Sequence, residues 1–435
     1  MRYLIVRLLL VCTSFVWAFA SIGFAADDSF FLREGDRVAL VGDAFFENEL
    51  KSCYLETMLT AAFPRTNATF RNFGWSGDDV RGSARARFGP PAEGFQHLKE
   101  DVLAFKPTVL LICYGMNESF AGEAGLPAFS AGYRALLDAI VPQAGRVVLI
   151  TPIRHQKLPP PLPDPSEHNH SLKLYIESIQ KIAVQRGYRF VDLFNAPETS
   201  SADLTTDGVH PTKPGYFAAA TGIGRSLGLS FDPGAVDFGA GKPTPDDQDL
   251  HAGPRDSKPG AVVFRIKTSM PFLPFRALDP RLGGDGSRKI ESVRANREAI
   301  ASVDPASLGL KVKFDQAATN KNVKQLAFAA RIDGIEVSRL RVDAQGFVQF
   351  PIAHGDVERV EKLRGAIVAK NELDFHRRRP ENETYLFLFR KHEQGQNARE
   401  IPMFDPLVEA KEKEIAELRV PLHHTYELIV KESGR

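Results

Sequence analysis

The sequence predicts an α/β protein with a doubly wound, mainly parallel sheet, to which a small β domain and a C-terminal helical tail are added. Short apolar segments alternate with amphipathic segments from about Asp28 to Leu229, as strands and helices do around a parallel sheet. Beyond residue 260, apolar and polar residues alternate as they do in half-buried strands. From Asp356 to Leu373 the apolar residues recur with the spacing of a helix.

The α/β part is expected to place its functional residues in the loops that follow its strands, because ligands bind at the carboxyl ends of such strands. The expected strands are the short apolar runs Arg37–Val41, Thr69–Phe73, Thr108–Cys113, Val147–Thr151 and Arg189–Leu193. Helices are expected between them, among others over Leu50–Ala62 and Leu126–Ala139.

Changes in composition predict the domain boundaries. Phe231–Gly260 is rich in Pro, Gly and Asp and has no sustained period, which is typical of a linker. The expected units are a signal peptide over 1–25, an α/β domain over 28–230, a linker over 231–259, a small β domain over 260–355 and a helical tail over 356–435 that packs on the body.

The β domain is predicted to be of the sandwich type. Leu310–Phe314 and Gly346–Phe350 alternate between apolar and polar residues. In Arg331–Val337 an Asp-Gly pair separates two such runs, which is a strong signal for a β-hairpin.

The tail has a second expected helix over Leu407–Leu418, preceded by an unusual segment over 375–397 that combines an arginine run with an apolar run. One interpretation is that this segment docks on the sheet through Tyr385, Phe387 and Phe389 while its charges stay in solvent. The alternative is that it folds over the functional site and adds polar ligands to it.

The N-terminus has the pattern of a signal peptide. Arg2 and Arg7 precede an apolar stretch, and Gly23 and Ala25 provide the small residues of a cleavage site. The protein is therefore expected to be exported to the periplasm or the extracellular space, with no integral membrane domain after cleavage. An uncleaved membrane anchor is the alternative, since the apolar stretch is nearly long enough to span a bilayer.

Composition and charge limit the classes of function. The 435 residues are 43% hydrophobic, which allows a substantial core, and the formal net charge is +1. Because a nearly neutral chain has no global field, no nucleic-acid partner is expected. Cys53 and Cys113 are expected to be buried as small apolar residues, with a disulfide as the alternative. No spacing typical of a metal site is present, and no metal or cofactor is expected.

Four short polar stretches occur where a hydrolase would place its reactive groups. They are Gly42-Asp43-Ala44 after the first strand, Asn72–Asp78 after the second, Tyr114–Glu118 after the third, and Thr206–Pro211 near the end of the domain. Each one alone also fits an ordinary turn. All four together, in this order, predict a catalytic site.

The residue types in these stretches suit acyl-transfer chemistry. Asp207 and His210 are three residues apart in a turn, so the carboxylate can orient the imidazole as a general base and stabilise its charged form. Gly77 lets its backbone N–H approach a ligand closely, and Asn117 supplies an amide N–H, so both are expected donors to a developing oxyanion. The simpler alternatives are a histidine in a turn, a glycine that only the turn requires, and a glycosylation acceptor at Asn117.

These stretches resemble the conserved blocks of the SGNH/GDSL hydrolase family over roughly residues 34–227. Ser76-Gly77-Asp78 matches the block that carries the oxyanion glycine. The matches to the family's Gly-x-Asn-Asp and Asp-x-x-His blocks are Gly115-Met116-Asn117, with Glu118 in place of the aspartate, and Asp207 with His210. The resemblance implies a flavodoxin-like fold and the hydrolysis of esters of acylated carbohydrates or lipids.

The sequence departs from the family at the nucleophile. Where the family has Gly-Asp-Ser, this chain has Gly42-Asp43-Ala44, and an alanine side chain cannot attack a carbonyl. The favoured hypothesis is an esterase-type hydrolase, acting on a small-molecule or carbohydrate ester, in which His210 activates a water in the space beside Ala44.

Two other hypotheses remain for the missing nucleophile. In the first, another residue is the nucleophile, with Ser76, Ser119 and Asp43 as the candidates, although Asp43 is expected to hydrogen-bond to the loop backbone. Alternatively, the protein is an inactive, carbohydrate-binding pseudoenzyme. Aromatic residues near the site would then stack on sugars, or pack in the core as phenylalanines more commonly do, and they are Phe45, Phe46 and Trp75.

Overall fold

A five-stranded parallel sheet with the order β2-β1-β3-β4-β5 forms the centre of the α/β part, as predicted. Its strands begin and end within two residues of the predicted bounds: β1 Arg37–Gly42, β2 Thr69–Gly74, β3 Val109–Cys113, β4 Arg146–Ile150 and β5 Arg189–Val191. β1 lies inside the sheet between β2 and β3, and its residues from Val38 to Gly42 are all buried, as expected of a strand covered on both faces.

The structure is a computed structural model, and the part of the chain that it describes covers most of residues 30–229 and shorter stretches beyond. The described residues are 30–142, 145–199, 204–229, 235–237, 249–251, 261–269, 275–278, 311–313, 327–337, 341–342, 347–393, 395 and 397–431. The expected signal peptide over 1–25 lies outside them. Among the described residues, no helix has both the length and the apolar character that crossing a membrane requires.

Helices cover both faces of the parallel sheet. Alternate residues of β1 point to opposite faces, so Val38 and Leu40 pack in one core cluster with α2 and α6, whereas Ala39 and Val41 pack in another with α3, α4 and α5. The helices of this part are α1 Ala44–Glu49, α2 Tyr54–Ala62, α3 Pro91–Ala104, α4 Gly122–Ile140, α5 Ser166–Arg186 and α6 Lys213–Ser226. Cys53 and Cys113 are buried free thiols, as predicted.

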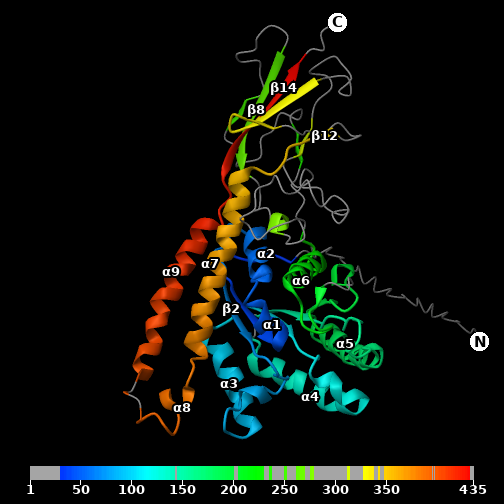
Figure 1. Cartoon of the computed structure of the whole chain (residues 1–435), viewed down its shortest axis with the longest axis vertical. Coiled ribbons are helices and arrows are strands. Elements are labelled where there is room, and N and C mark those ends of the chain that lie inside the picture. Colours follow the sequence, from blue (N-terminus) through cyan, green and yellow to red (C-terminus); the bar gives the residue numbers. More distant parts are fainter. Residues whose placement is uncertain are drawn as a thin grey trace, which may run out of the picture.

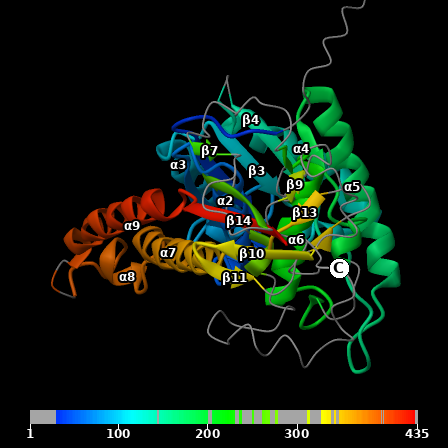
Figure 2. The ribbon, with the colours of Figure 1, turned by 90° about the horizontal axis from the view of Figure 1, so that it is seen from above.

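The tail begins with a long helix, α7 (His354–Arg378), that runs from the parallel sheet to the β-rich part (Figure 1). It packs against α9 (Phe404–Leu418), and a short helix, α8 (Glu383–Leu386), lies between them in the chain. Figure 2 shows α7 and α9 on one flank of the molecule, with α4 and α5 on the opposite flank.

Helix α7 covers the free edge of β2, which is an end strand of the sheet. Lys370 Nζ donates to the carbonyl of Phe70 at 3.0 Å, and Arg378 Nη2 donates to the carbonyl of Asn72 at 2.6 Å. These bonds satisfy strand carbonyls that would otherwise be open to pairing with another chain. A buried ion pair between Lys370 and Glu56 at 2.7 Å ties the same helix to α2.

The β-rich part contains a five-stranded sheet with the order β11-β10-β14-β8-β7 and a four-stranded sheet with the order β12-β13-β9-β6. The predicted hairpin is present: β10 and β11 are antiparallel, and Asp333 and Gly334 between them both have positive φ, as a tight two-residue turn requires. The strands are β6 Ala235–Asp237, β7 Asp249–His251, β8 Ala261–Ser269, β9 Lys311–Lys313, β10 Ala327–Ile332, β11 Ile335–Val337, β12 Arg341–Val342, β13 Phe347–Gln349 and β14 His423–Lys431.

Two of the expected domain boundaries differ from the structure. The expected linker over 231–259 contains β6 and β7, which pair with β9 and β8. The expected helical tail over 356–435 ends in β14, which lies between β8 and β10 and pairs with β8 from His423–Ser269 to Lys431–Ala261. The end of the chain therefore completes the β-rich part, because the partners of β14 come from far earlier in the sequence.

Candidate active site

Asp207 and His210 form the predicted pair in a tightly bonded turn. His210 Nδ1 lies 2.7 Å from Asp207 Oδ2, and the other carboxylate oxygen of Asp207 accepts the backbone N–H groups of Val209 at 3.0 Å and of His210 at 2.8 Å. Partial burial acts against ionisation of Asp207, but the His210 backbone and ring and the Val209 N–H outweigh it and lower its pKa to about 2. Asp207 is thus a carboxylate that fixes the orientation of the His210 ring.

A glycine and a neighbouring loop hold this turn in place. Gly208 has a φ of +90°, and a Cβ on it would lie 2.6 Å from the carbonyl oxygen of Gln156, so no other residue fits there without displacing the loop. The Gly208 carbonyl accepts the Gln156 N–H at 2.7 Å, and the Gly208 N–H donates to Thr205 Oγ1 at 3.1 Å. The loop after β4 therefore positions the Asp207–His210 turn.

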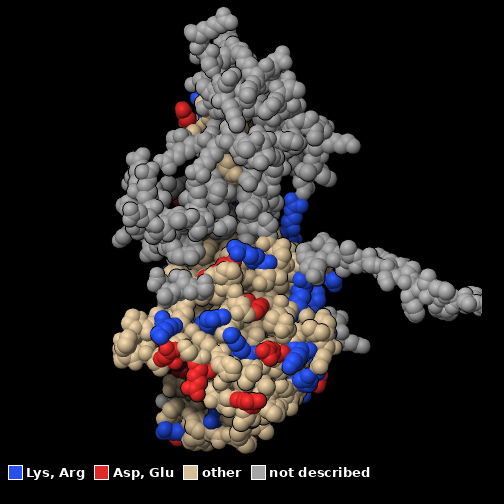
Figure 3. All heavy atoms as spheres, turned by 90° about the vertical axis from the view of Figure 1, so that its right-hand side faces the viewer, with Lys and Arg blue, Asp and Glu red and all other residues tan. Residues whose placement is uncertain are grey.

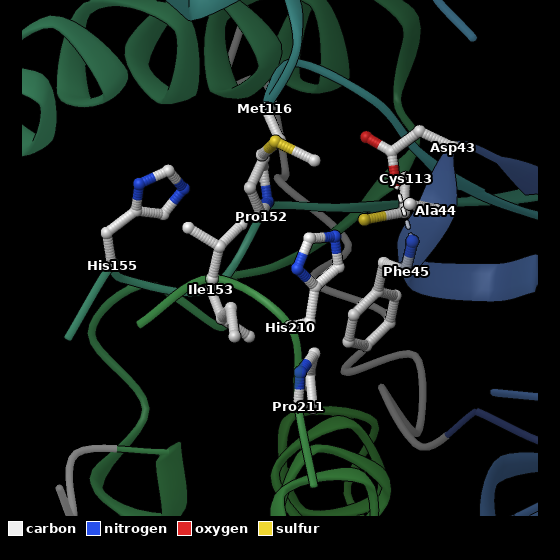
Figure 4. Close-up of a pocket in the computed structure, with 11 residues that line it drawn as sticks. Asp43, Ala44, Phe45, Cys113, Met116, Pro152, Ile153, His155, His210 and Pro211 are labelled. Carbon is white, nitrogen blue, oxygen red and sulfur yellow. Dashed lines mark hydrogen bonds between the residues drawn. The ribbon is translucent and has the colours of Figure 1, made fainter. Parts of the chain in front are cut away.

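His210 and Ala44 line the same pocket, which opens at the carboxyl ends of β1, β3 and β4. Figure 4 shows the His210 ring turned toward Ala44, with Nε2 on the side that faces the start of α1. Since Nδ1 is bonded to Asp207, Nε2 is the nitrogen available to a reacting molecule. The position where the resemblance predicts a nucleophile thus faces the predicted base.

Asp43 contributes a buried carboxyl group to this pocket. Its Oδ1 caps α1 by accepting the Phe45 N–H at 2.9 Å, which confirms the predicted bond to the loop backbone. Its Oδ2 is also buried and has no hydrogen-bond partner among the described residues. Burial, partly offset by the Phe45 N–H, raises the pKa of Asp43 to about 7. The group is therefore able to hold or release a proton near neutral pH.

The predicted oxyanion donors lie on loops beside the pocket but do not line it. Asn117 uses one N–H of its side chain to donate to the Asp78 carbonyl at 2.6 Å, which joins the loop after β3 to the loop after β2. The N–H of Gly77 has no partner among the described residues, and its φ of +78° suits the turn. These loops follow β2 and β3, the strands on either side of β1, and the convergence of Gly77 and Asn117 on the pocket remains a prediction.

Glu118, which departs from the family pattern, has a structural task in this site. Its Oε1 accepts the N–H of Val80 at 2.9 Å and its Oε2 accepts the N–H of Gly115 at 3.0 Å, so it also joins the loops after β2 and β3. Burial raises the pKa of Glu118 to about 8. The glutamate side chain, which is longer than the family's aspartate, reaches both loops. The Asn117 side chain is held separately, by its bond to the Asp78 carbonyl.

Of the alternative nucleophiles, Asp43 alone lines the pocket. Ser119 is buried, and its Oγ donates to the Met116 carbonyl at 2.7 Å and contacts His168 Nε2 at 3.1 Å. Ser76 is exposed, and its backbone N–H donates to Glu47 Oε2 at 2.5 Å. Both serines are therefore poorly placed to attack a molecule beside Ala44.

The three aromatic residues expected near the site have different surroundings. Phe45 lines the pocket and packs against Tyr216, with 5.5 Å between ring centroids. Phe46 is fully buried in the core. The indole of Trp75 lies against two guanidinium groups, 3.9 Å from Arg379 and 5.1 Å from Arg85. Phe45 is thus the member of this group that can contact a bound molecule in the pocket.

The 375–397 segment contacts the α/β part both through Phe389, as the first interpretation of its sequence expected, and through charged side chains. Phe387 and Phe389 are both exposed, but the Phe389 ring lies edge-on to Phe88 with 5.9 Å between centroids. Arg379 pairs with Glu47 at 3.0 Å and stacks on Trp75, and Glu383 pairs with Arg87 at 2.9 Å. The segment therefore reaches the loop that carries Ser76 and Gly77, but it places no residue among those that line the pocket.

His155 is a pocket residue that the sequence analysis missed. It follows β4, as do Pro152 and Ile153, and all three line the pocket. Ligands bind at the carboxyl ends of the strands in this class of fold, and this principle, applied to the residues after the fourth strand, predicts all three as site residues. Among the described residues, no group of three or more potential metal ligands is present.

Figure 3 shows the face of the molecule on which α5 lies, with Lys and Arg interspersed among Asp and Glu on its described part. This mixture agrees with the small net charge of the chain. The lining of the pocket contains no Lys or Arg, and its charged or titratable groups are Asp43, His155, His210 and the buried thiol Cys113. The lining therefore offers no permanent cation to a bound anion.

Residues 37–218 match the model of the GDSL-like Lipase/Acylhydrolase family, in agreement with the resemblance that the motifs carry. A gut microbial diltiazem-metabolizing enzyme has a similar fold over 93% of this chain and 99% of its own, with a TM-score of 0.58 and 14% identity. Axe2, an acetylxylan esterase from Geobacillus stearothermophilus, aligns with 46% of this chain and 98% of its own, with a TM-score of 0.38 and 20% identity. No curated protein matches the chain.

Proposed function

We propose that the protein hydrolyses esters of acylated carbohydrates by direct attack of water. The observation that carries this proposal is the pocket shared by Ala44, the oriented base His210 and the buried, partnerless Oδ2 of Asp43. Replacing serine by alanine leaves about the volume of one hydroxyl group, and Asp43 and His210 offer polar atoms to a water in that space. The match of residues 37–218 to the family model supports the reaction class.

The reaction needs no covalent intermediate. His210 Nε2 takes a proton from the water while the water oxygen bonds to the ester carbonyl carbon, and the carbonyl electrons move to the oxygen. Gly77 and Asn117 are the proposed donors to this oxyanion. When the oxyanion collapses, the bond to the alcohol oxygen breaks and His210 returns the proton to that oxygen. Asp207 stabilises the imidazolium during the step.

The second candidate is a binding module without turnover, and the observation that favours it is Ala44 itself. Phe45 and the apolar lining of the pocket would then hold the ligand, and the Asp207–His210 pair would only shape the turn. This candidate predicts binding of esters without release of acid.

The experiment that tests the proposal is Ala44→Ser. The variant should raise the hydrolysis of p-nitrophenyl acetate by roughly two orders of magnitude or more, because the base and the proposed donors would already be in place. Ala44→Val, which fills the space without adding a nucleophile, is the matched control and should reduce the wild-type rate. A folded Ala44→Ser variant that is as inert as an inactive wild type would reject the hydrolase proposal and favour the binding module.

We also propose that the protein is exported, on the N-terminal pattern alone. The expected result is a mature chain that lacks about the first 25 residues, as measured by intact mass after expression in a bacterial host. Recovery of the full-length chain in the membrane fraction would instead support an uncleaved anchor.

A further inference from the structure

His155 carries a buried polar atom that faces the pocket and has no partner. The residue is 5% exposed, and its Nε2 has no hydrogen-bond partner among the described residues. Figure 4 shows this nitrogen on the side of the ring that faces Met116 and Pro152, across the pocket from Ala44. Leaving such an atom unpaired costs about 1–3 kcal/mol, and an unpaired group in a native site calls for a physical explanation.

The surrounding residues hold the His155 backbone firmly. Asn169 forms a reciprocal pair of hydrogen bonds with it, accepting its N–H at 3.0 Å and donating to its carbonyl at 2.8 Å. Both Asn169 and the neighbouring His168 belong to α5, so one helix fixes the backbone of residue 155 and supports its ring. A residue held in this way loses little further entropy when it binds a ligand.

A stack of rings supports the His155 side chain. The His168 ring lies 4.4 Å from it with an interplanar angle of 18°, and Phe120 stacks on His168 at 4.0 Å. The hydroxyl of Ser119 donates its hydrogen to the Met116 carbonyl, so Ser119 Oγ can only accept a hydrogen bond from His168. His168 therefore carries its ring hydrogen on Nε2. His168 is thus paired with Ser119, whereas the buried His155 Nε2 has no partner among the described residues and lies on the pocket side of its ring.

His155 is an uncharged group at neutral pH. Burial, and then the adjacent His168 ring, lower its pKa to about 4. A neutral imidazole has one N–H donor and one acceptor nitrogen, so it can pair with a hydroxyl or, as the Nε2–H tautomer, with a carbonyl oxygen. The apolar surroundings and the absence of Lys and Arg from the lining favour an uncharged ligand.

We propose that His155 Nε2 is a ligand-binding group that pairs with an uncharged hydroxyl or carbonyl oxygen of the molecule held beside Ala44. Stacked on His168 and Phe120, the His155 ring forms the wall of a specificity subsite on the side of the pocket away from Asp43 and Ala44. The class of ligand, a neutral oxygen-rich ester, rests on the proposed function. The subsite itself rests on the buried nitrogen and does not require turnover.

The test measures binding of a probe that the chain cannot hydrolyse as an ester, methyl N-acetyl-β-D-glucosaminide, by ligand-observed NMR. His155→Phe keeps the ring and its stacking but removes the nitrogen, and we expect its Kd to rise about tenfold, as loss of one hydrogen bond implies. His155→Gln places a polar atom near the position of Nε2 and should stay within about threefold of the wild type. His170→Phe, an exposed position on the same helix, is the matched control and should leave the Kd unchanged.

Two smaller probes distinguish whether Nε2 binds a carbonyl oxygen or a hydroxyl group of the ligand. Acetamide offers a carbonyl oxygen and methyl β-D-xylopyranoside offers hydroxyl groups, so the probe whose affinity falls in His155→Phe identifies the group that Nε2 contacts. Thermal unfolding of each variant, monitored by circular dichroism, checks that the fold is retained. His155→Phe keeps the ring stack but loses the polar atom, whereas His155→Gln loses the ring stack but keeps a polar atom, so binding that survives in His155→Gln and not in His155→Phe depends on the polar atom rather than on the stack.

The outcomes for the subsite and for the hydrolase are distinct. A wild type that does not bind any probe at tens of millimolar, or a His155→Phe variant that binds like the wild type, overturns the subsite whatever the esterase assays give. Conversely, His155-dependent binding in a protein that remains inert after Ala44→Ser supports the subsite and rejects the hydrolase proposal.

Discussion

The side chain of Ala44 lies in the pocket that a general base and a buried carboxyl group also line. His210 is oriented by Asp207 through the ring and the backbone together, so this pair retains the geometry of a base. Whether an ester can be hydrolysed here depends on which molecule occupies the space beside the methyl group of Ala44. A water there has His210 and Asp43 as partners, whereas neither Ser76 nor Ser119 lines the pocket.

At the residue scale, we predict that His210→Ala lowers the hydrolysis rate of an activated ester about a hundredfold or more, because it removes the proton acceptor. Asp207→Asn should cost as much or less, since the asparagine still contacts the ring but no longer stabilises its charged form. Initial rates measure both effects. His170→Ala serves as the control for loss of an exposed histidine.

Water attack also predicts that no acyl group becomes attached to the protein. Rapid quenching during turnover of a slow ester, followed by intact mass measurement and peptide mapping, should show the unmodified chain. An adduct on Asp43 would identify it as a nucleophile and contradict direct water attack, and an adduct on Ser76 would require the loop after β2 to move. In either case the nucleophile would lie at a position other than 44.

At the scale of elements, the C-terminal arm formed by α7 and α8 is coupled to the loop that carries Gly77. Arg378 and Lys370 of α7 satisfy carbonyls of β2, and Arg379 just beyond it pairs with Glu47 and stacks on Trp75. Glu47 in turn accepts the N–H of Ser76. The arm thus braces the loop that follows β2.

We predict that Arg379→Ala loosens this loop. The emission of Trp75 should shift to longer wavelength and become more accessible to acrylamide, because one face of the indole loses its guanidinium. The sequence has two tryptophans, and Trp17 lies in the expected signal peptide, so the measurement uses either the chain without residues 1–25 or a Trp17→Phe background. In the same variant the esterase rate gained by Ala44→Ser should fall several-fold, through kcat more than KM, if Gly77 donates to the oxyanion.

Arg377→Ala is the matched control for that experiment. Arg377 is next but one in the chain and pairs with Asp405 of α9 at 2.8 Å, on a more exposed surface away from Trp75. Its loss should leave the Trp75 emission unchanged. Equal spectral changes in both variants would show that the arm acts through its general packing, and the specific role of Arg379 would be rejected.

At the scale of the whole molecule, a buried histidine joins three segments that are distant in the sequence. His424 of β14 pairs with Asp333 of the hairpin turn at 2.6 Å and with Asp356 near the start of α7 at 3.3 Å. Asp356 and then Asp333 outweigh burial and raise the pKa of His424 to about 9. The protonated ring therefore links the β-rich part to the helix that covers β2.

This pairing predicts a loss of stability on the alkaline side. Because the folded pKa lies above the ordinary value of 6.5, the stabilisation is complete below about pH 6.5 and is lost as the pH rises through about 9. We expect a decrease of roughly 1–2 kcal/mol, less than the full shift implies, since the Asp333 side chain is 48% exposed. Urea unfolding between pH 6 and 9.5 measures it.

Two variants separate His424 from other groups that titrate in this range. His424→Gln should remove most of this pH dependence while lowering the stability at pH 6. His423→Gln, the exposed neighbouring histidine, should preserve it. A wild type whose free energy of unfolding is constant from pH 6 to 9.5 would contradict the linkage, as would an unchanged slope in His424→Gln.

The sequence by itself determined the features that depend on neighbouring residues. The strands of the parallel sheet, the turn that joins Asp207 to His210 and the hairpin at Asp333-Gly334 all follow from short-range patterns, since apolar periodicity and turn chemistry act over a few residues. The motif order also placed Ala44 and His210 at one edge of the sheet, because parallel strands end at the same edge.

The tertiary structure alone decided the contacts between segments far apart in the chain. β14 pairs with β8 and β10, α7 covers the edge of β2, and His155 comes to the pocket with its Nε2 unpaired. The apolar pattern of a strand is the same whichever strand it pairs with. The sequence of a helix likewise does not indicate which edge carbonyl its side chains will bind. Whether a buried side-chain atom has a partner is likewise decided by what the rest of the chain places around it.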